Sequence, residues 1–320
     1  MASHNRRKRF VALGGTILAL LVVLAVVHRV RAAPPNVDTA FVLPSGTSVW
    51  SMRIGNDTRT FRVHVPESFD PMSPAPLLIM LHGGFGSGRQ AERAYGWDQE
   101  ADAYGFIVAY PNGLGRAWNA GGGCCGKPGR SDTDDVAFIS AMIAAIERHA
   151  AIDTARIFAT GISNGGIMAY RLACETNLFA AIAPVAATML GSCEGPQPLS
   201  VLHIHGLVDE RVPFDGSRGA GTAHIDGPPV ADVVAFWQER DDCPDPGVVT
   251  IAPITTAIAT CPENRSVVLI TVADAGHQWP GARGKRIGAL LGLRDRPSTA
   301  FNATGVILQF FAAHPKPADA

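Results

Sequence analysis

Six short apolar segments, which alternate with helical patterns, constrain the fold of this chain more than any other feature. A strand with one solvated face alternates apolar and polar residues, whereas these segments are apolar along most of their length. They comprise residues 77–81, 106–110, 156–160, 180–185, 201–205 and 267–272. Helical periodicity occurs at residues 91–104, 134–149, 165–175, 230–240 and 300–313. This alternation predicts a doubly wound α/β fold, in which helices cover both faces of a mostly parallel sheet.

The region before these segments has a different pattern. Residues 49–54 and 60–65 alternate on either side of a Gly-Asn-Asp turn, which predicts an N-terminal β-hairpin. Neither a second domain nor an internal repeat is apparent, and 320 residues suffice for one large domain. The expected organisation is a leader at 1–33, a linker at 34–48, a single catalytic domain at 49–314 and a tail at 315–320.

The leader carries a cationic head and an apolar run. Four basic residues at 6–9 precede an apolar run at 10–27, and small residues and prolines follow. This pattern is typical of a secretory signal peptide. The run is about long enough to span a bilayer, so an uncleaved N-terminal anchor is the alternative. Either way the positive head predicts that the catalytic domain lies outside the cell, secreted or membrane-anchored, and touches a membrane only through this segment.

Six cysteines follow the leader, and an even number in an exported protein indicates disulfides. Short loop closure favours the pairs Cys174–Cys193 and Cys243–Cys261, which leaves Cys124 and Cys125 to each other. A bond between adjacent cysteines would be unusual. Zinc binding is the competing interpretation, but no pair has the CxxC spacing of zinc sites. We therefore expect no metal.

A candidate nucleophile lies between a predicted strand and a predicted helix. Gly161-Ile162-Ser163-Asn164-Gly165 follows the segment 156–160. A GxSxG sequence in a tight strand-to-helix turn is the nucleophile elbow of α/β-hydrolases, with the serine hydroxyl above the sheet. The alternative is that Ser163 merely caps the helix.

Candidates for the acid and the base follow later strands. Asp209 comes just after the segment 201–205, and His277 after 267–272. The order serine, acid, histidine is that of α/β-hydrolases, and catalytic groups gather at the carboxyl ends of parallel strands. Asp209 could instead be a turn carboxylate. The alternatives for the base are His82, His205 and His224.

A glycine-rich sequence leaves the first apolar segment. An HGG-type loop in this place supplies one N–H of an oxyanion hole, and the residue after the nucleophile supplies the other. The candidates are therefore the amides of Asn164 and of Gly84 or Phe85. An ordinary glycine-rich turn is the alternative.

Several motifs together resemble the extracellular esterase family of polyhydroxybutyrate depolymerases, LpqC-like mycobacterial esterases and related feruloyl and acetylxylan esterases. The motifs are Leu81-His82-Gly83-Gly84, Trp118-Asn119-Ala120-Gly121 with Cys124-Cys125-Gly126, Asp134-Asp135-Val136-Ala137-Phe138, Gly161-Ile162-Ser163-Asn164-Gly165-Gly166, His205-Gly206-Leu207-Val208-Asp209 and Gly276-His277-Gln278-Trp279-Pro280-Gly281. The resemblance implies the triad Ser163, Asp209 and His277. It also implies that Trp118 and Trp279 line an acyl or sugar pocket, although either could simply fill the core.

The expected function is a serine carboxylic-ester hydrolase that forms an acyl-enzyme and needs no cofactor. Depolymerases of this family usually append a substrate-binding domain, and this chain ends after its last predicted helix. The expected substrates are thus soluble feruloyl or acetyl carbohydrate esters, or hydroxyalkanoate oligomers. An exported acyltransferase, a non-catalytic binding protein and a peptidase are the alternatives. Nucleic acid is excluded as a partner, since the net charge is −1 and no basic stripe is present.

Overall fold

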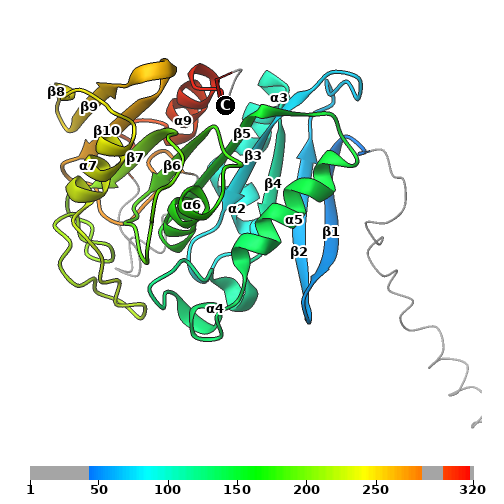
Figure 1. Cartoon of the computed structure of the whole chain (residues 1–320), viewed down its shortest axis with the longest axis horizontal. Coiled ribbons are helices and arrows are strands. Elements are labelled where there is room, and N and C mark those ends of the chain that lie inside the picture. Colours follow the sequence, from blue (N-terminus) through cyan, green and yellow to red (C-terminus); the bar gives the residue numbers. More distant parts are fainter. Residues whose placement is uncertain (1–42, 283–297, 318–320) are drawn as a thin grey trace, which may run out of the picture. The chain divides into compact units, whose positions relative to one another are not determined.

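The centre of the fold is a ten-stranded sheet in the order β1-β2-β4-β3-β5-β6-β7-β10-β9-β8 (Figure 1). The computed structural model describes residues 43–282 and 298–317, so the predicted leader, most of the predicted linker and half of the predicted tail lie outside the described residues. The strands are β1 (Gly46–Ile54), β2 (Asp57–Val65), β3 (Ala75–Leu81), β4 (Ile107–Pro111), β5 (Ile152–Ile162), β6 (Ala181–Val185), β7 (Ser200–Gly206), β8 (Gly247–Ile251), β9 (Ile254–Thr260) and β10 (Ser266–Val272).

The middle of the sheet is parallel and its two margins are antiparallel. Strands β4, β3, β5, β6, β7 and β10 pair in parallel, and each overlaps one of the six apolar segments. Their carboxyl ends therefore share one edge of the sheet. The predicted hairpin is present as β1 and β2, and β2 pairs antiparallel with β4. The predicted mostly parallel α/β fold is confirmed.

The hairpin β8–β9 was not predicted from the sequence. It extends the sheet beyond β10, with β8 at the margin. Every residue of β8 is exposed, and Val248 and Val249 retain 63% and 61% of their accessible surface. A solvated edge strand packs against no second layer, so it lacks the polar–apolar alternation by which a strand is recognised.

Helices cover both faces of the sheet (Figure 1). Helices α5 (Asp135–Glu147), α6 (Asn164–Glu175) and α7 (Val230–Arg240) bury one apolar cluster against the sheet, and α2 (Gly88–Tyr95), α3 (Trp97–Tyr104) and α9 (Ala303–Ala313) bury a second. The short helix α4 (Gly126–Arg130) lies in the 113–132 loop, at the lower edge of Figure 1. No helix within residues 43–282 and 298–317 is both long and apolar enough to cross a membrane.

One predicted helix is two helices. The pattern at 91–104 predicted a continuous helix, but α2 ends and α3 begins at Gly96, whose φ of 78° lies in the left-handed region. Glycine adopts this conformation without the steric cost that a Cβ imposes, so the chain turns there. Helix α2 begins three residues earlier than predicted, because the Ser87 side chain accepts a hydrogen bond from the Gln90 amide.

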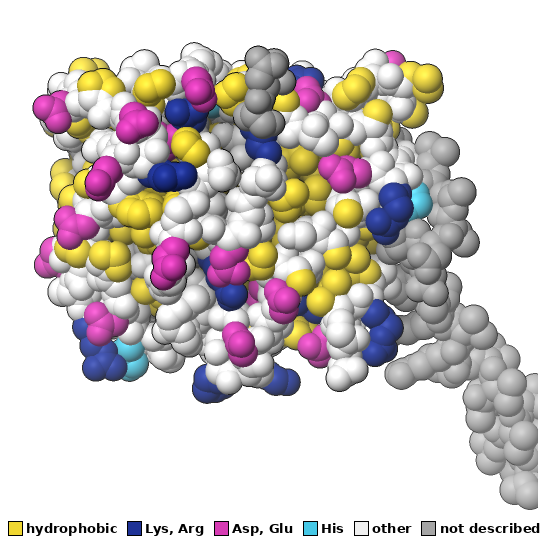
Figure 2. Space-filling model, in the orientation of Figure 1, with side chains coloured by type: hydrophobic (Ala, Val, Ile, Leu, Met, Phe, Trp, Pro, Cys, Tyr) yellow, Lys and Arg dark blue, Asp and Glu magenta, His cyan; other side chains and the backbone are white. Residues whose placement is uncertain are grey.

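The six cysteines form three disulfides. The pairs are Cys124–Cys125, Cys174–Cys193 and Cys243–Cys261. The first lies in the 113–132 loop beside the site described below. On the face shown in Figure 2, basic and acidic side chains are interspersed and neither sign forms a continuous patch.

Candidate active site

Ser163 occupies a sharp turn between β5 and α6. Its φ of 56° and ψ of −127° are unusual for a residue with a side chain. The turn is held because the Ser163 amide donates to the Val185 carbonyl at 2.9 Å, and the Ser163 carbonyl accepts from the Ile167 amide at 2.9 Å. The Ser163 hydroxyl makes no capping hydrogen bond to α6. The elbow therefore presents the hydroxyl without using it as a helix cap.

The flanking glycines are required by close backbone approach. A Cβ on Gly161 would lie 2.6 Å from the Gly165 backbone, and a Cβ on Gly165 would lie 2.4 Å from the Leu81 carbonyl oxygen. Both distances are far below van der Waals contact, so no larger residue fits. The GxSxG pattern is thus the local sequence that lets β5, β3 and α6 meet at this turn.

His277 and Asp209 form a hydrogen-bonded pair. The His277 Nδ1 lies 2.8 Å from the Asp209 Oδ2, and the two side chains are 11% and 0% exposed. A carboxylate only accepts, so the His277 Nδ1 carries a proton and donates it to Asp209, and Nε2 is the second ring nitrogen. The other carboxylate oxygen, Oδ1, accepts from the amides of Arg211 and Val212 at 2.8 and 2.9 Å.

These contacts also lower the pKa of the Asp209 carboxyl. Burial by itself raises the pKa of this group, but the hydrogen bond and charge of His277 and the amide of Val212 outweigh it. The pKa of Asp209 therefore lies below its usual value, and the group is an anion at neutral pH. An ionised carboxylate hydrogen-bonded to an imidazole orients the ring and can stabilise its protonated form.

Ser163 and the pair lie at the same edge of the sheet. Ser163 follows β5, Asp209 follows β7 and His277 follows β10, and these strands are parallel members of the order β5-β6-β7-β10. Two backbone hydrogen bonds join the last two loops, from Leu207 to the Val272 carbonyl and from Val208 to the Ala275 carbonyl. The topology thus gathers three segments that are distant in sequence.

The alternative bases have other surroundings. His82 is fully buried; its Nδ1 donates to the Gly83 carbonyl at 2.8 Å and its Nε2 accepts from the Gly113 amide at 3.0 Å. His205 is also buried, and both its nitrogens have partners within the protein. His224 lies exposed in the loop after β7. Of these four histidines, His277 is the one hydrogen-bonded to Asp209.

We expect His82 to make the fold sensitive to acid. Burial lowers the pKa of His82 to about 4, from an ordinary value of 6.5. Between pH 6.5 and 4, His82 therefore binds a proton in the unfolded chain but stays neutral in the folded protein. Stability from this group is complete above pH 6.5 and is lost as the pH falls through 4, by about 3 kcal/mol in the free energy of unfolding.

The test is urea unfolding of the wild type and of His82→Asn at several pH values. Asparagine keeps a donor near the Nδ1 position but does not titrate. The pH dependence between 7 and 4 should be smaller in the variant by roughly the same 3 kcal/mol. Equal slopes for the two proteins would contradict a neutral His82.

The structure corrects one of the oxyanion candidates. The Phe85 amide donates to the Arg116 carbonyl at 2.8 Å, so it does not serve a substrate oxygen. Gly84 remains the candidate in this loop, and a Cβ there would meet nothing within 4 Å. The second candidate, the amide of Asn164, stands at the first residue of α6. Amides at a helix N-terminus are well placed to stabilise an oxyanion.

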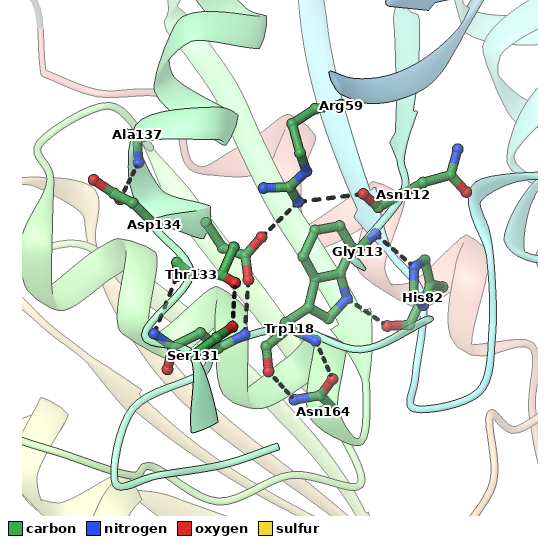
Figure 3. Close-up of polar contacts among 12 residues, drawn as sticks. Arg59, His82, Asn112, Gly113, Trp118, Ser131, Thr133, Asp134, Ala137 and Asn164 are labelled. Atoms are coloured by element: carbon green, nitrogen blue, oxygen red, sulfur yellow. Dashed lines mark hydrogen bonds and ion pairs between the residues drawn. The ribbon is translucent and has the colours of Figure 1, made fainter. Parts of the chain in front are cut away.

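The Asn164 side chain binds the neighbouring loop rather than solvent (Figure 3). Its Oδ1 accepts from the Trp118 amide at 2.7 Å, and its Nδ2 donates to the Trp118 carbonyl at 3.1 Å. The same Nδ2 lies 4.0 Å from the Cys124 Sγ. The residue after the predicted nucleophile is thereby fixed to the loop that holds the Cys124–Cys125 disulfide.

Trp118 and Trp279, the predicted pocket walls, both lie in the interior of the protein. Trp118 is 0% exposed, and its indole N–H donates to the His82 carbonyl at 2.8 Å. Trp279 is 3% exposed; it donates to the Thr304 hydroxyl at 3.1 Å and packs on Tyr95. Both rings fill the interior, with their N–H groups satisfied, as buried indoles require.

Apolar side chains that sequence reasoning missed are exposed in the loops at this edge. Phe85, Leu207 and Val208 retain 71%, 45% and 57% of their accessible surface. Phe85 follows the candidate oxyanion residue Gly84, and Leu207 and Val208 directly precede Asp209. The available signal was a pair of large apolar residues in a turn, between a strand end and a candidate catalytic acid.

A buried ion pair between Arg59 and Asp135 supports the loop that carries Asn119. Asp135 binds the Arg59 guanidinium at 2.6 Å through one oxygen and the Asn119 amide at 2.7 Å through the other. Arg59 and Asp135 are 1% and 0% exposed. Burial raises the pKa of Asp135 even though Arg59 opposes this. The motif at 134–138 thus anchors the segment that carries Trp118.

Comparisons with known proteins agree with this architecture. Residues 97–191 match the prolyl oligopeptidase family, a segment with Ser163 but neither Asp209 nor His277. The putative esterase NocK of Nocardia uniformis subsp. tsuyamanensis is 32% identical over 301 residues, covering 83% of this chain and 84% of NocK. The acetyl xylan esterase from Aspergillus awamori shares the fold with a TM-score of 0.57 at 14% identity, over 83% of this chain and 99% of that one.

Fungal relatives match over a shorter stretch. The probable feruloyl esterase C of Aspergillus terreus is 34% identical over 166 residues, or 49% of this chain and 57% of its own length. The chain thus spans little more than half of that relative.

The parallel sheet, its two helical layers and the nucleophile-elbow geometry define an α/β-hydrolase, and with these relatives a carboxylic-ester hydrolase. The chain belongs to the same family of esterases as NocK.

Proposed function

We propose that Ser163, His277 and Asp209 form the catalytic triad of this esterase and act through an acyl-enzyme. The observation that carries the proposal is the 2.8 Å hydrogen bond between the His277 Nδ1 and the Asp209 Oδ2, at the sheet edge where the Ser163 elbow lies. It leaves the His277 Nε2 as the nitrogen that accepts the serine proton.

The reaction proceeds in two acyl transfers. The Ser163 Oγ attacks the ester carbonyl while the His277 Nε2 takes its proton, and the amides of Asn164 and Gly84 bind the oxyanion. When the tetrahedral intermediate collapses, the alcohol leaves with the proton from His277. A water molecule then attacks the acyl-enzyme, again with His277 as base, and releases the carboxylic acid and free Ser163.

The substrates that we propose are soluble esters with an apolar or aromatic acyl group, such as feruloyl carbohydrate esters, or else acetyl carbohydrate esters or hydroxyalkanoate oligomers. The names of the Aspergillus relatives, a probable feruloyl esterase and an acetyl xylan esterase, support feruloyl esters and acetylated xylan. Exposed Phe85, Leu207 and Val208 support an apolar acyl group, since exposed apolar side chains in loops beside a site are available for contact with a ligand.

We also propose that the enzyme acts outside the cell, either secreted or anchored by its N-terminal segment. The basic head and apolar run at 6–27 support export. The three disulfides support an oxidising compartment.

The experiment that tests the triad is labelling with a fluorophosphonate probe. We expect one covalent adduct, located by peptide mass spectrometry on Ser163, and its formation should be slowed by prior incubation with an ester. Heat-unfolded protein is the control and should not react, since an unactivated serine is a poor nucleophile. An adduct on any other residue, or none, would contradict the proposal.

Product analysis defines the reaction further. We expect free acid from feruloyl methyl ester, acetylated xylan or 3-hydroxybutyrate oligomers, even with an added alcohol acceptor. Transfer of the acyl group to the acceptor as the main product would instead establish an acyltransferase.

A further inference from the structure

A buried chain of hydrogen bonds lies behind Asp209. The Tyr170 hydroxyl of α6 lies 2.7 Å from the His203 Nδ1, and the His203 Nε2 lies 2.9 Å from the His205 Nδ1. The His205 Nε2 lies 2.8 Å from the Val212 carbonyl oxygen. Both histidines are on β7, two residues apart, and are 0% and 1% exposed. The triad proposed above uses none of these side chains.

All the hydrogen bonds of this series donate in the same direction, from Tyr170 toward Val212. The Val212 carbonyl only accepts, so the proton of His205 is on Nε2. The His205 Nδ1 then accepts, so the His203 Nε2 donates to it, and the His203 Nδ1 accepts from the Tyr170 hydroxyl. Burial lowers the pKa of both His203 and His205, which favours the neutral rings that this order requires. Each ring is therefore confined to its Nε2–H tautomer.

Val212, the last acceptor in this series of hydrogen bonds, belongs to the turn that orients the Asp209 carboxylate. The Val212 amide donates to the Asp209 Oδ1 at 2.9 Å, while the Val212 carbonyl accepts from His205. The His205 Nε2 is also 3.6 Å from the Asp209 Oδ2, the oxygen that binds His277. His205 thus holds the turn that fixes one carboxylate oxygen and places an N–H dipole near the other.

We propose that His205 is a positioning residue for Asp209, kept in its Nε2–H tautomer by the hydrogen-bond chain from Tyr170 through His203. This inference rests on the proposed triad. His205 touches neither substrate nor His277 in this role; it acts through the orientation of the Asp209 carboxylate. A shift of about 1 Å in catalytic geometry can reduce a rate by about 10²-fold.

The kinetic test compares two substitutions at one position. His205→Leu removes the donor, and we expect kcat for p-nitrophenyl acetate to fall by about 10- to 100-fold with little change in KM. His205→Gln places an amide N–H where the Nε2–H was and should recover most of the wild-type kcat. His64→Leu is the matched control. His64 is likewise a buried strand histidine, but it lies on β2, which β4, β3, β5 and β6 separate from β7, and it is hydrogen-bonded to Thr47 and Asp102. Its loss should leave kcat unchanged.

The spectroscopic test does not depend on activity or on the folding of the His205 variants. In ¹⁵N-labelled wild-type and Ser163→Ala protein, imidazole NMR should show both His203 and His205 as neutral Nε2–H tautomers across neutral pH. An Nδ1–H tautomer or an imidazolium at either position contradicts the proposed series of hydrogen bonds and leaves the hydrolase proposal intact. A His205→Leu enzyme with wild-type kcat overturns the positioning role. Activity that survives in Ser163→Ala overturns the proposed triad instead, and the two failures are distinguishable.

Discussion

Ser163→Ala is expected to lower kcat for p-nitrophenyl acetate by about 10⁴- to 10⁶-fold, while the protein remains folded. The hydroxyl is the nucleophile of the first acyl transfer in the proposed mechanism, and loss of the nucleophile in a serine triad has an effect of about this size. The turn itself is held by the backbone hydrogen bonds of residue 163 with Val185 and Ile167, which alanine retains. The measurement is steady-state hydrolysis together with circular dichroism.

Ser140→Ala is the matched control. The Ser140 hydroxyl donates to the Val136 carbonyl within α5, remote from the elbow in the chain, and its loss should not affect kcat. If Ser163→Ala kept more than about a tenth of the wild-type kcat, the acyl-enzyme mechanism would have to be abandoned.

Arg59→Met is expected to lower the free energy of unfolding by about 3–5 kcal/mol, because it leaves the Asp135 carboxylate buried without its counterion. The double variant Arg59→Met/Asp135→Leu should lose less, since it removes both charges. It still leaves the Asn119 amide without its acceptor, at a cost of about 1–3 kcal/mol. Urea unfolding of the three proteins measures both differences.

Arg156→Met provides the comparison for an exposed pair. Arg156 and Asp153 are 41% and 28% exposed, so this change should lower stability by no more than about 1 kcal/mol. Equal effects of Arg59→Met and Arg156→Met would show that the buried pair is not the anchor that its geometry indicates.

The sequence predicted those features that depend on local pattern. The six apolar segments identified the parallel core because buried strands carry apolar residues on both faces. The GxSxG turn, Asp209 and His277 could be chosen because each directly follows such a strand, and the structure joins Asp209 to His277. Glycines at an elbow and polar residues at strand ends are visible without knowledge of the loops.

Features that depend on contacts between distant loops were not predictable. The Phe85 amide looked as suitable for an oxyanion as that of Gly84, until its bond to the Arg116 carbonyl was seen. The indoles of Trp118 and Trp279 find acceptors from distant segments, the His82 carbonyl and the Thr304 hydroxyl. The sequence around a tryptophan does not show whether a segment distant in the chain will bury its side chain.

The double hydrogen bond between Asn164 and the Trp118 backbone bears on how this enzyme could be redesigned. It ties the residue after the predicted nucleophile to the loop that holds the Cys124–Cys125 disulfide, so we expect substitution of Asn164 to disturb the site for every ester alike. Changes in selectivity should instead begin at Phe85, Leu207 and Val208, whose exposed side chains can be enlarged or trimmed without opening a void in the core. The residue that must stay constant, Asn164, is thus distinct from the exposed residues that can be varied to change the selectivity.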